Sequence, residues 1–300
     1  MQKVFFISDH FAEKFVGGAE MALEAVIEQC PFEVVKVESE NVTENMIAEE
    51  MSGNFVVVGN FTKLDGVKMM EKIVEHCKFA IIEYDFKMCG SRNPTLHHYR
   101  TGVEFKEPIP EIKAFFEKAE CVFFMSKRQM DWATAVCQMK RCEVLSSTFT
   151  FDQFEMIERI RKEPECERVG HVIQYSDSTV KGTKQSIEYA YRKIIDYKLL
   201  YNLSNEEMFR EFKKAIGFIF LPFGEDTCPR TVIEAKLLGC KVIVNSNVLN
   251  HDEPWFDTED HEVTFAYLKG RVPFFWGVFN EITGNMGYAC GGAGRECVRV

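Results

Sequence analysis

Residues 218–244 constrain the fold of this 300-residue chain more than any other segment. They open with an apolar run at 218–221, pass through an acidic loop, and close with a second apolar run at 241–244. Pro229 and Gly239 delimit a helix-forming stretch between them, because proline suits a first helical position and glycine a helix end. The segment therefore predicts strand, helix and strand, the repeating unit of an open α/β sheet.

The same alternation of short apolar runs and helical patterns occupies most of the chain. Expected strands lie at 4–7, 33–37, 55–58, 79–82, 121–125, 143–145, 172–175, 198–201, 218–221 and 241–244. Expected helices include 19–29, 67–75, 109–118, 183–195, 204–215 and 229–238. Continuous apolar strands alternating with helices indicate parallel sheets that are covered on both faces.

A change of composition divides this pattern into two parts. Residues 150–168 are highly charged and include Pro164, which is typical of a domain boundary. We therefore expect two doubly wound, Rossmann-like domains. The expected boundaries are 1–155 for the first domain, 168–264 for the second, 265–283 for a last helix and 284–300 for a flexible tail.

Composition excludes several classes of protein. No apolar run approaches the ~18 residues of a membrane helix, and the amino terminus has the pattern of a first strand rather than of a signal peptide. Eleven cysteines without CxxC pairs predict reduced thiols and a cytoplasmic location. The formal charge of −10 gives no global support for nucleic-acid binding.

Three acidic residues of the segment 218–244 are candidate ligand-binding groups. Glu225 and Asp226 follow a strand, and Glu234 lies in the next helix, beside backbone N–H groups suited to phosphate. Carboxylates that bind hydroxyls, together with a phosphate site, describe a nucleotide sugar. Arg230 is a candidate phosphate ligand, although its spacing from Glu234 also fits a plain intrahelical ion pair.

Two further strand–helix junctions carry candidate phosphate-binding residues. Gly17 and Gly18 precede the helix at 19–29, where paired glycines let the backbone approach an anion. A flexible turn is the alternative explanation. Lys181 follows the strand at 172–175 and precedes a helix, so it can reach a diphosphate as a point charge, or it is an exposed loop lysine.

Histidines offer weaker candidates. His97 lies in the polar and aromatic segment 83–101, whose candidate sugar-facing or acceptor-facing groups also include Asp85, Arg92 and Arg100. His251 and His261 have acidic neighbours, but their spacing matches no structural zinc pattern, and we expect no metal site.

The motifs quoted above resemble those of GT-B glycosyltransferases, specifically the retaining family-4-like group. The matching segments are Gly17-Gly18-Ala19-Glu20, Lys181-Gly182, and Asp226-x7-Glu234-Ala235 followed by Gly239. The first acid of that pattern is Asp226, or Glu225 if the loop carries one extra residue. The Gly-Arg that usually precedes Lys-Gly is absent, and Arg230 is the candidate replacement for that basic ligand.

The resemblance implies two domains that face each other across a cleft, with the last helix crossing back to the first domain. The first domain would take the acceptor and the second the nucleoside diphosphate sugar, with a UDP-sugar favoured and no metal required. Glu234 would hold the ribose, and Asp226 or Glu225 the sugar hydroxyls. The implied donor contacts are Gly17, Gly18, Lys181, Glu225, Asp226, Arg230, Thr231 and Glu234, and the catalytic candidates are Lys181, Asp226 and His97.

Transfer of a sugar to an acceptor hydroxyl is therefore the leading hypothesis, and three alternatives stay open. Compact GT-B proteins of this kind resemble bacteriophage enzymes that glycosylate hydroxymethylated pyrimidines in DNA, which would place the protein in the host cytoplasm. A non-catalytic module that binds nucleotide sugars is the second alternative, and a sugar epimerase is the third.

Overall fold

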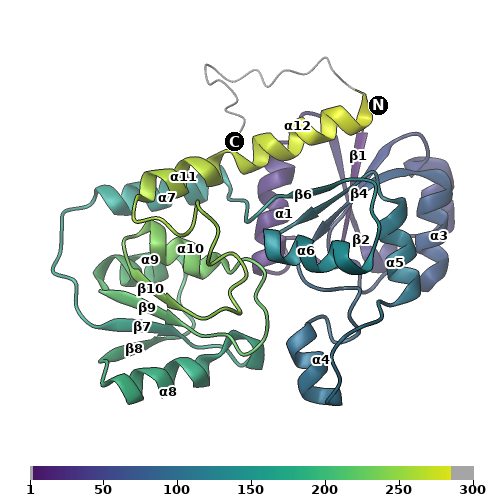
Figure 1. The fold of residues 1–300 in the computed structure, drawn as a ribbon. Coiled ribbons are helices and arrows are strands. Elements are labelled where there is room, and N and C mark those ends of the chain that lie inside the picture. The colour runs from purple at the N-terminus through teal and green to yellow at the C-terminus, as the bar shows by residue number, and fades with distance from the viewer. Residues whose placement is uncertain (1–2, 285–300) are drawn as a thin grey trace.

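The computed structural model describes residues 3–284, which form two α/β domains, each built on a parallel sheet (Figure 1). The described strands of the first domain form a sheet in the order β2-β1-β3-β4-β5-β6. Their bounds are β1 (Lys3–Ser8), β2 (Glu33–Glu38), β3 (Phe55–Val58), β4 (Lys78–Glu83), β5 (Cys121–Phe124) and β6 (Cys142–Val144). The strands and the α/β fold class agree with the sequence prediction.

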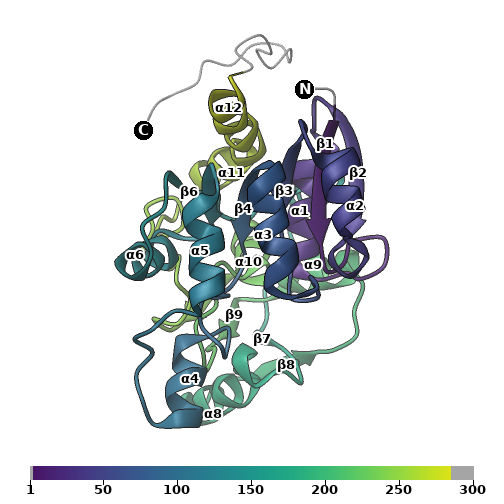
Figure 2. The ribbon, with the colours of Figure 1, turned by 90° about the vertical axis from the view of Figure 1, so that its right-hand side faces the viewer.

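Alternating side chains place the first sheet between two apolar layers. Val4 and Phe6 of β1 face the layer that contains α1 (Gly18–Glu28). Phe5 and Ile7 face the opposite layer, with α3 (Gly66–His76), α5 (Pro110–Lys118) and α6 (Lys127–Val136). Figure 2 shows α3 and α5 side by side over that face. Shorter elements of this domain are η1 (Ser39–Asn41), α2 (Glu44–Met46), η2 (Ile47–Met51) and α4 (Pro94–Thr101).

The second domain repeats the design with fewer strands. Its described sheet has the order β10-β9-β7-β8, built from β7 (His171–Gln174), β8 (Tyr197–Leu200), β9 (Gly217–Phe220) and β10 (Lys241–Val244). Ile173 and Ile219 face α8 (Thr183–Lys193), which follows the single turn η3 (Thr179–Lys181). Val172 and Phe218 face the other layer, which holds α9 (Asn205–Lys214) and α10 (Arg230–Leu237).

The structure differs from the predicted elements at several helix boundaries. The segment 150–168 holds α7 (Phe151–Lys162), whose capping box joins Thr150 and Gln153 and which packs against α9. The sequence analysis took this segment for a domain boundary because the charged residues on the outer face of the helix dominate its composition. Pro229 is the N-cap of α10 rather than its first residue. The helices α4 and α6 were not predicted.

The expected last helix is divided at Gly270 into α11 (His261–Lys269) and α12 (Arg271–Thr283). Pro273 accounts for the interruption, because it has no N–H to donate back across the break. The predicted tail lies outside the described residues from residue 285 onward.

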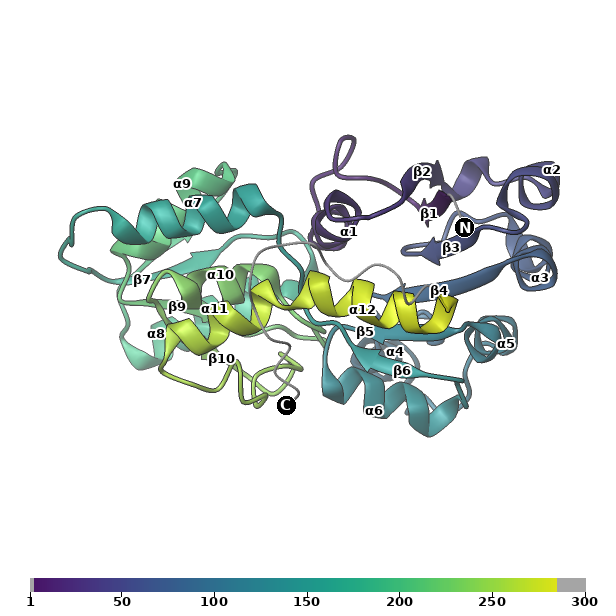
Figure 3. The same cartoon turned by 90° about the horizontal axis from the view of Figure 1, so that it is seen from above.

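The helix α12 crosses back onto the first domain, as predicted (Figure 3). Phe275 packs on Phe123 with ring centroids 4.6 Å apart, and Phe279 packs on Phe55 at 4.7 Å. The indole of Trp276 donates a hydrogen bond to the carbonyl of Val26 at 3.1 Å. No helix among the described residues combines the length and the apolar character that a membrane crossing requires.

Candidate functional site

The loops at the carboxyl ends of the two sheets contact each other, and we call this region the junction. The hydroxyl of Thr227, after β9, donates to the carbonyl of Tyr84, after β4, at 2.7 Å. Ser146, after β6, lies 3.6 Å from the thiol of Cys228. Ligands of open parallel sheets bind at these carboxyl edges, so the junction is the place to look for the predicted site residues.

Lys181 and Asp226, two predicted site residues that lie 45 positions apart, form an ion pair at the junction. The Lys181 ammonium donates to Oδ2 of Asp226 at 2.7 Å. The carboxylate of Asp226 is 10% exposed, whereas the lysine side chain is 46% exposed. The amine therefore has a fixed partner on one side and access to solvent on the other.

Gly182 explains why Lys181 lies at this position. Its φ is +66°, a left-handed conformation that glycine adopts without steric cost. A Cβ atom there would overlap the carbonyl oxygen of Leu221, because the loop after β7 runs directly against the end of β9. The amide of Phe223 donates to the carbonyl of Val180 at 3.0 Å and fixes the same approach.

The helices α8 and α10 both begin at the junction. Gly182 is the N-cap of α8 and Pro229 that of α10, and no side chain of the described residues caps either helix. The first N–H groups of a helix have no intrahelical acceptor, and they carry the positive end of the helix dipole. Thr231 lies in this first turn of α10. Together with Lys181, the two helix starts favour an anion.

Arg230 and Glu234 lie on α10 and are both almost buried. The Arg230 guanidinium donates to the carbonyl of Thr148 and, at 2.8 Å, to Oε1 of Gln153. It also stacks 4.1 Å from the ring centre of Phe149. These contacts join α10 to the segment that connects the two sheets. In this structure the guanidinium therefore links the domains, and its predicted contact with phosphate stays a prediction.

The carboxylate of Glu234 has no close hydrogen-bond donor among residues 3–284. Its Oε1 lies 3.8 Å from Nε of Arg230, which is longer than a hydrogen bond. Burial raises the pKa of Glu234, and Arg230 lowers it in part. Burial also lowers the pKa of Arg230. A carboxylate in this position keeps the capacity to accept hydrogen bonds from ligand hydroxyls.

Gly17 and Gly18 bring the start of α1 against α10. A Cβ atom on Gly18 would lie 3.6 Å from Cδ of Arg230, so the two helix starts adjoin. A Cβ atom on Gly17 would overlap the carboxylate of Glu20, which is itself buried and accepts from Asn60 at 3.4 Å. Any larger residue at Gly17 would have to displace the side chains of Glu20 and Phe15, and α1 presents a carboxylate at the junction.

Glu225 has a different partner from its neighbour Asp226. Its carboxylate accepts from the amide of Thr95 at 3.0 Å and from the Thr95 hydroxyl at 2.7 Å, and its carbonyl accepts from Asn93 at 2.8 Å. It therefore caps α4 across the domain boundary. His97, on the same helix, packs edge-on against Phe105. No contact among the described residues joins His97 to Lys181 or Asp226, so its catalytic role stays a prediction.

Tyr84 is a residue of the junction that the sequence analysis missed. Its hydroxyl oxygen is buried and has no hydrogen-bond partner among the described residues. Burial raises the pKa of Tyr84, and Glu20 raises it further, whereas Arg230 lowers it. The only signal in the sequence was its position two residues after the strand predicted at 79–82.

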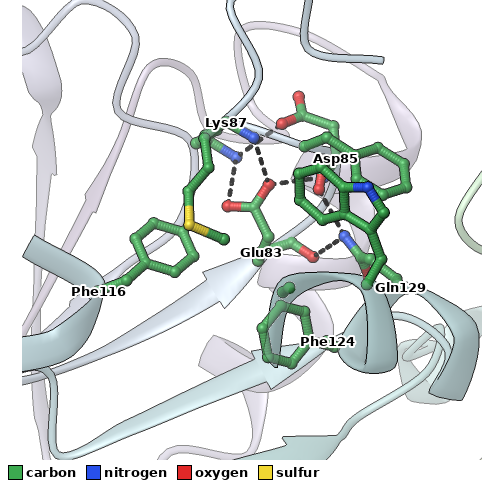
Figure 4. A pocket seen from close by; sticks show the side chains of 10 residues that line it. Glu83, Asp85, Lys87, Phe116, Phe124 and Gln129 are labelled. Carbon is green, nitrogen blue, oxygen red and sulfur yellow. Dashed lines mark hydrogen bonds and ion pairs between the residues drawn. The ribbon is translucent and has the colours of Figure 1, made fainter. Parts of the chain in front are cut away.

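A buried ionic cluster lies at the carboxyl end of β4, where Glu83 and Asp85 flank Tyr84 in the sequence (Figure 4). Oε1 of Glu83 accepts from the amide of Lys87 at 3.1 Å, and the Lys87 ammonium lies between Glu83 at 3.5 Å and Asp85 at 3.4 Å. Asp85 also accepts from Nε of Arg92 at 2.7 Å, and Gln129 donates to the carbonyls of Glu83 and Asp85. The cluster holds the loop that carries Tyr84. Asp85 and Arg92, two of the candidate sugar-facing or acceptor-facing groups, pair with each other in this cluster, and their contact with a ligand stays a prediction.

The described residues contain no group of three or more His, Cys, Asp and Glu side chains that could hold a metal ion. Nδ1 of His251 lies 2.8 Å from the carbonyl of Val248 and 3.4 Å from Arg128. His261 begins α11, with its Nδ1 buried. These two histidines therefore have separate surroundings.

No family model matches this chain, and no curated protein matches its sequence. Solved structures do resemble it. The UDP-forming trehalose-phosphate synthase of Burkholderia xenovorans aligns with 96% of this chain and 100% of its own, with a TM-score of 0.54 and 8% identity.

Two further structures align at the same level. The catalytic domain of starch synthase IV from Arabidopsis thaliana, bound to ADP and acarbose, covers 96% of this chain and 95% of its own, with a TM-score of 0.53 and 8% identity. Anabaena HepE, in complex with UDP and glucose, covers 95% and 100%, with a TM-score of 0.53 and 10% identity. These likenesses confirm the GT-B fold.

Proposed function

We propose that this protein is a glycosyltransferase that moves a sugar from a nucleoside diphosphate sugar to an acceptor hydroxyl. The observation that carries the proposal is the Lys181–Asp226 pair, which lies where α8 and α10 begin at the contact between two GT-B domains. The neighbours solved with UDP or ADP support the class of donor. The likeness of Asp226-x7-Glu234 to the retaining group supports retention of configuration without a metal ion.

The diphosphate would lie against the half-exposed amine of Lys181. Its negative charge would be shared with the N–H groups at the starts of α8 and α10, among them the amide of Thr231. Asp226 keeps the amine in place and is available to accept from sugar hydroxyls. Electrostatic stabilisation of this kind is strongest for charge that develops during the reaction.

Glu234 would bind the ribose. Its carboxylate is almost buried, and the part of the chain that the structure describes offers it no close hydrogen-bond donor, so two ribose hydroxyls could donate to it. Gly17 and Gly18 would let α1 close against the donor from the first domain. We assign His97 to the acceptor side, because α4 belongs to the first domain and contacts the donor loop through Glu225.

In the reaction, the bond between the anomeric carbon and the diphosphate oxygen breaks, and its electron pair stays with the diphosphate. The acceptor oxygen forms the new bond to the same carbon, and its proton is released. Lys181 and the helix starts stabilise the negative charge that grows on the departing diphosphate. This contribution should dominate, because the leaving group carries the charge that develops.

Thermal unfolding with UDP, GDP, ADP and their common sugars tests the proposal. A ligand at 100 times its dissociation constant stabilises the folded state by about 2.7 kcal/mol. Lys181→Ala should abolish the shift, whereas Lys184→Ala, at an exposed position of the following helix α8, should preserve it. If no nucleotide stabilises the wild-type protein, the proposal is wrong.

Product analysis then separates transfer from binding alone. The nucleotide that binds is supplied as its sugar, with glycans and hydroxymethylated DNA among the acceptors, and release of the free diphosphate is measured. Glu234→Ala should weaken donor binding by about 1–3 kcal/mol, since it removes charge-assisted hydrogen bonds. Binding without release under any acceptor would favour the non-catalytic module.

A further inference from the structure

The helix α4 depends little on its own domain for its position. Leu96 is the only one of its eight residues that is buried, and Figure 1 shows α4 set apart from the other helices of the first domain. An isolated helix of fewer than about 12 residues is marginal in water. Contacts from outside the first domain therefore have to contribute to holding α4 in place.

The loop between β9 and α10 supplies such contacts from the second domain. The carboxylate of Glu225 accepts from the amide of Thr95 at 3.0 Å and from its hydroxyl at 2.7 Å, and the Glu225 carbonyl accepts from Asn93, the N-cap of α4, at 2.8 Å. Further along the helix, the ring of Tyr99 lies edge-on to that of Phe223, with centroids 5.2 Å apart. One loop of the second domain therefore contacts both the start and the middle of α4.

This loop is itself fixed by the loop after β10. The amide of Asp226 donates to the carbonyl of Asn247 at 2.7 Å, and the amide of Leu249 donates to the carbonyl of Asp226 at 3.0 Å. Glu253, from the second of these loops, accepts from the amide of Lys127 at 2.8 Å, at the start of α6. The two loops therefore form one unit whose carboxylates cap two helices of the first domain.

Glu225 and Asp226 are neighbours in the sequence but make their contacts in different domains. Both carboxylate oxygens of Glu225 accept from Thr95, whereas Asp226 pairs with Lys181 of its own domain at 2.7 Å. A sugar hydroxyl that donated to Glu225 would therefore compete with the cap of α4.

We infer that Glu225 is a positioning residue for the acceptor rather than a ligand of the donor, an inference that rests on the proposed function. It holds α4, with the candidate acceptor-facing groups His97 and Arg100, next to the loop that carries Asp226. One loop thereby sets the positions of the donor-binding carboxylate and of the acceptor-side helix. The acceptor site is complete only while Glu225 and Thr95 join the two domains.

Four proteins test this assignment: the wild type, Glu225→Ala, Glu225→Gln and Glu207→Ala. Glu207 is the matched control, because its carboxylate accepts from the amide of Ser204 at 2.8 Å and from the Ser204 hydroxyl at 2.7 Å, but within the second domain. Amide hydrogen exchange of α4 is measured first and requires no ligand. Calorimetric titration then compares the nucleotide sugar that stabilises the wild type with its nucleoside diphosphate, which has no sugar.

Glu225→Ala should accelerate exchange of the α4 amides by roughly 2- to 30-fold, the range for loss of a helix cap. Glu225→Gln should restore most of the protection, because its side-chain oxygen still accepts from the Thr95 amide, and Glu207→Ala should leave α4 unchanged. All three variants should bind both ligands like the wild type. In the assay of diphosphate release, Glu225→Ala should raise the KM for the acceptor that the wild type uses and leave the KM for the donor unchanged.

Equal exchange of α4 in Glu225→Ala and in the wild type would overturn the assignment. Weaker binding of the nucleotide sugar by Glu225→Ala, with unchanged binding of the nucleoside diphosphate, would also overturn it, since that pattern places Glu225 against the sugar. If the wild type binds neither ligand, the proposed function itself fails, and the exchange measurement still decides whether Glu225 holds α4.

Discussion

Replacement of Arg230 by alanine should be among the most destabilising single changes in this chain. The guanidinium is buried, donates to Thr148 and Gln153 and stacks on Phe149. Among the described residues it is also the only ionic partner of Glu234. Alanine would remove all of these contacts at once. It would also leave the Glu234 carboxylate buried without a compensating charge.

The expected cost follows from this geometry. Removing one partner of a buried ion pair costs about 3–5 kcal/mol, because the other charge remains without compensation. Exposed pairs contribute only about 0–1 kcal/mol. Arg210 provides the matched control, since it pairs with Glu163 and Glu206 at 2.6 and 2.8 Å but is 38% exposed. Arg210→Ala should therefore cost much less than Arg230→Ala.

The pH dependence of this cost has a defined sign. Burial raises the pKa of Glu234 and Arg230 lowers it, so the pKa rises further in Arg230→Ala. The folded variant then holds a proton that the unfolded chain has released above about pH 4.3. Its free energy of unfolding therefore falls as the pH rises toward the folded pKa, and the cost of the substitution is smaller at about pH 5 than at about pH 7.5.

Urea unfolding of both variants at these two pH values is the measurement. The double variant Arg230→Met, Glu234→Gln should recover part of the loss, because it removes both charges from the protein interior. A cost for Arg230→Ala no larger than that for Arg210→Ala would refute the interdomain role of the guanidinium. A cost independent of pH would refute the coupling to Glu234.

Three further substitutions separate structural from ligand-binding roles. Gly182→Ala should lower the free energy of urea unfolding by at least about 1–3 kcal/mol, because residue 182 has a positive φ and the added Cβ would also overlap Leu221. Gly66 has a positive φ too, but a Cβ there would meet open space, so Gly66→Ala should cost less. Tyr84→Phe should leave the free energy of unfolding within about 0.5 kcal/mol of wild type, since the lost hydroxyl has no described partner, but should slow diphosphate release if that hydroxyl contacts the donor. Burial raises the pKa of Glu83 to about 8. The protonated carboxyl therefore stabilises the folded state fully below the ordinary carboxyl pKa, and this contribution is lost as the pH rises toward 8. Glu83→Gln should remove this part of the pH dependence of the free energy of unfolding.

The repeating units of the fold could be read from the sequence because their signals are local. The strands within 218–244 are continuous apolar runs, and Ser204 with Glu207 forms the capping box expected at the start of α9. The helix α7 was missed because its buried positions, such as Ile157, are outnumbered by charged residues on the exposed face. Periodicity, rather than composition, would have identified it.

In the candidate site, too, local signals could be read from the sequence and contacts between domains could not. The closeness of Lys181 and Asp226 could be predicted, since each follows a strand of one parallel sheet and such positions share an edge. The partner of Glu225 could not, because Thr95 lies 130 positions earlier in another domain. Tyr84 was missed for a related reason, as a lone tyrosine after a strand carries no motif. The packing of the two domains decides what each of these residues contacts.

The crossing of α12 has a consequence for how the chain is synthesised. Trp276 donates to Val26, which lies 250 residues earlier, and Phe275 and Phe279 cover the same sheet face. At about 5–20 residues per second, roughly 12–50 s separate translation of the two partners. The first domain therefore leaves the ribosome with an apolar face uncovered, and its core is completed only when the last helix has emerged.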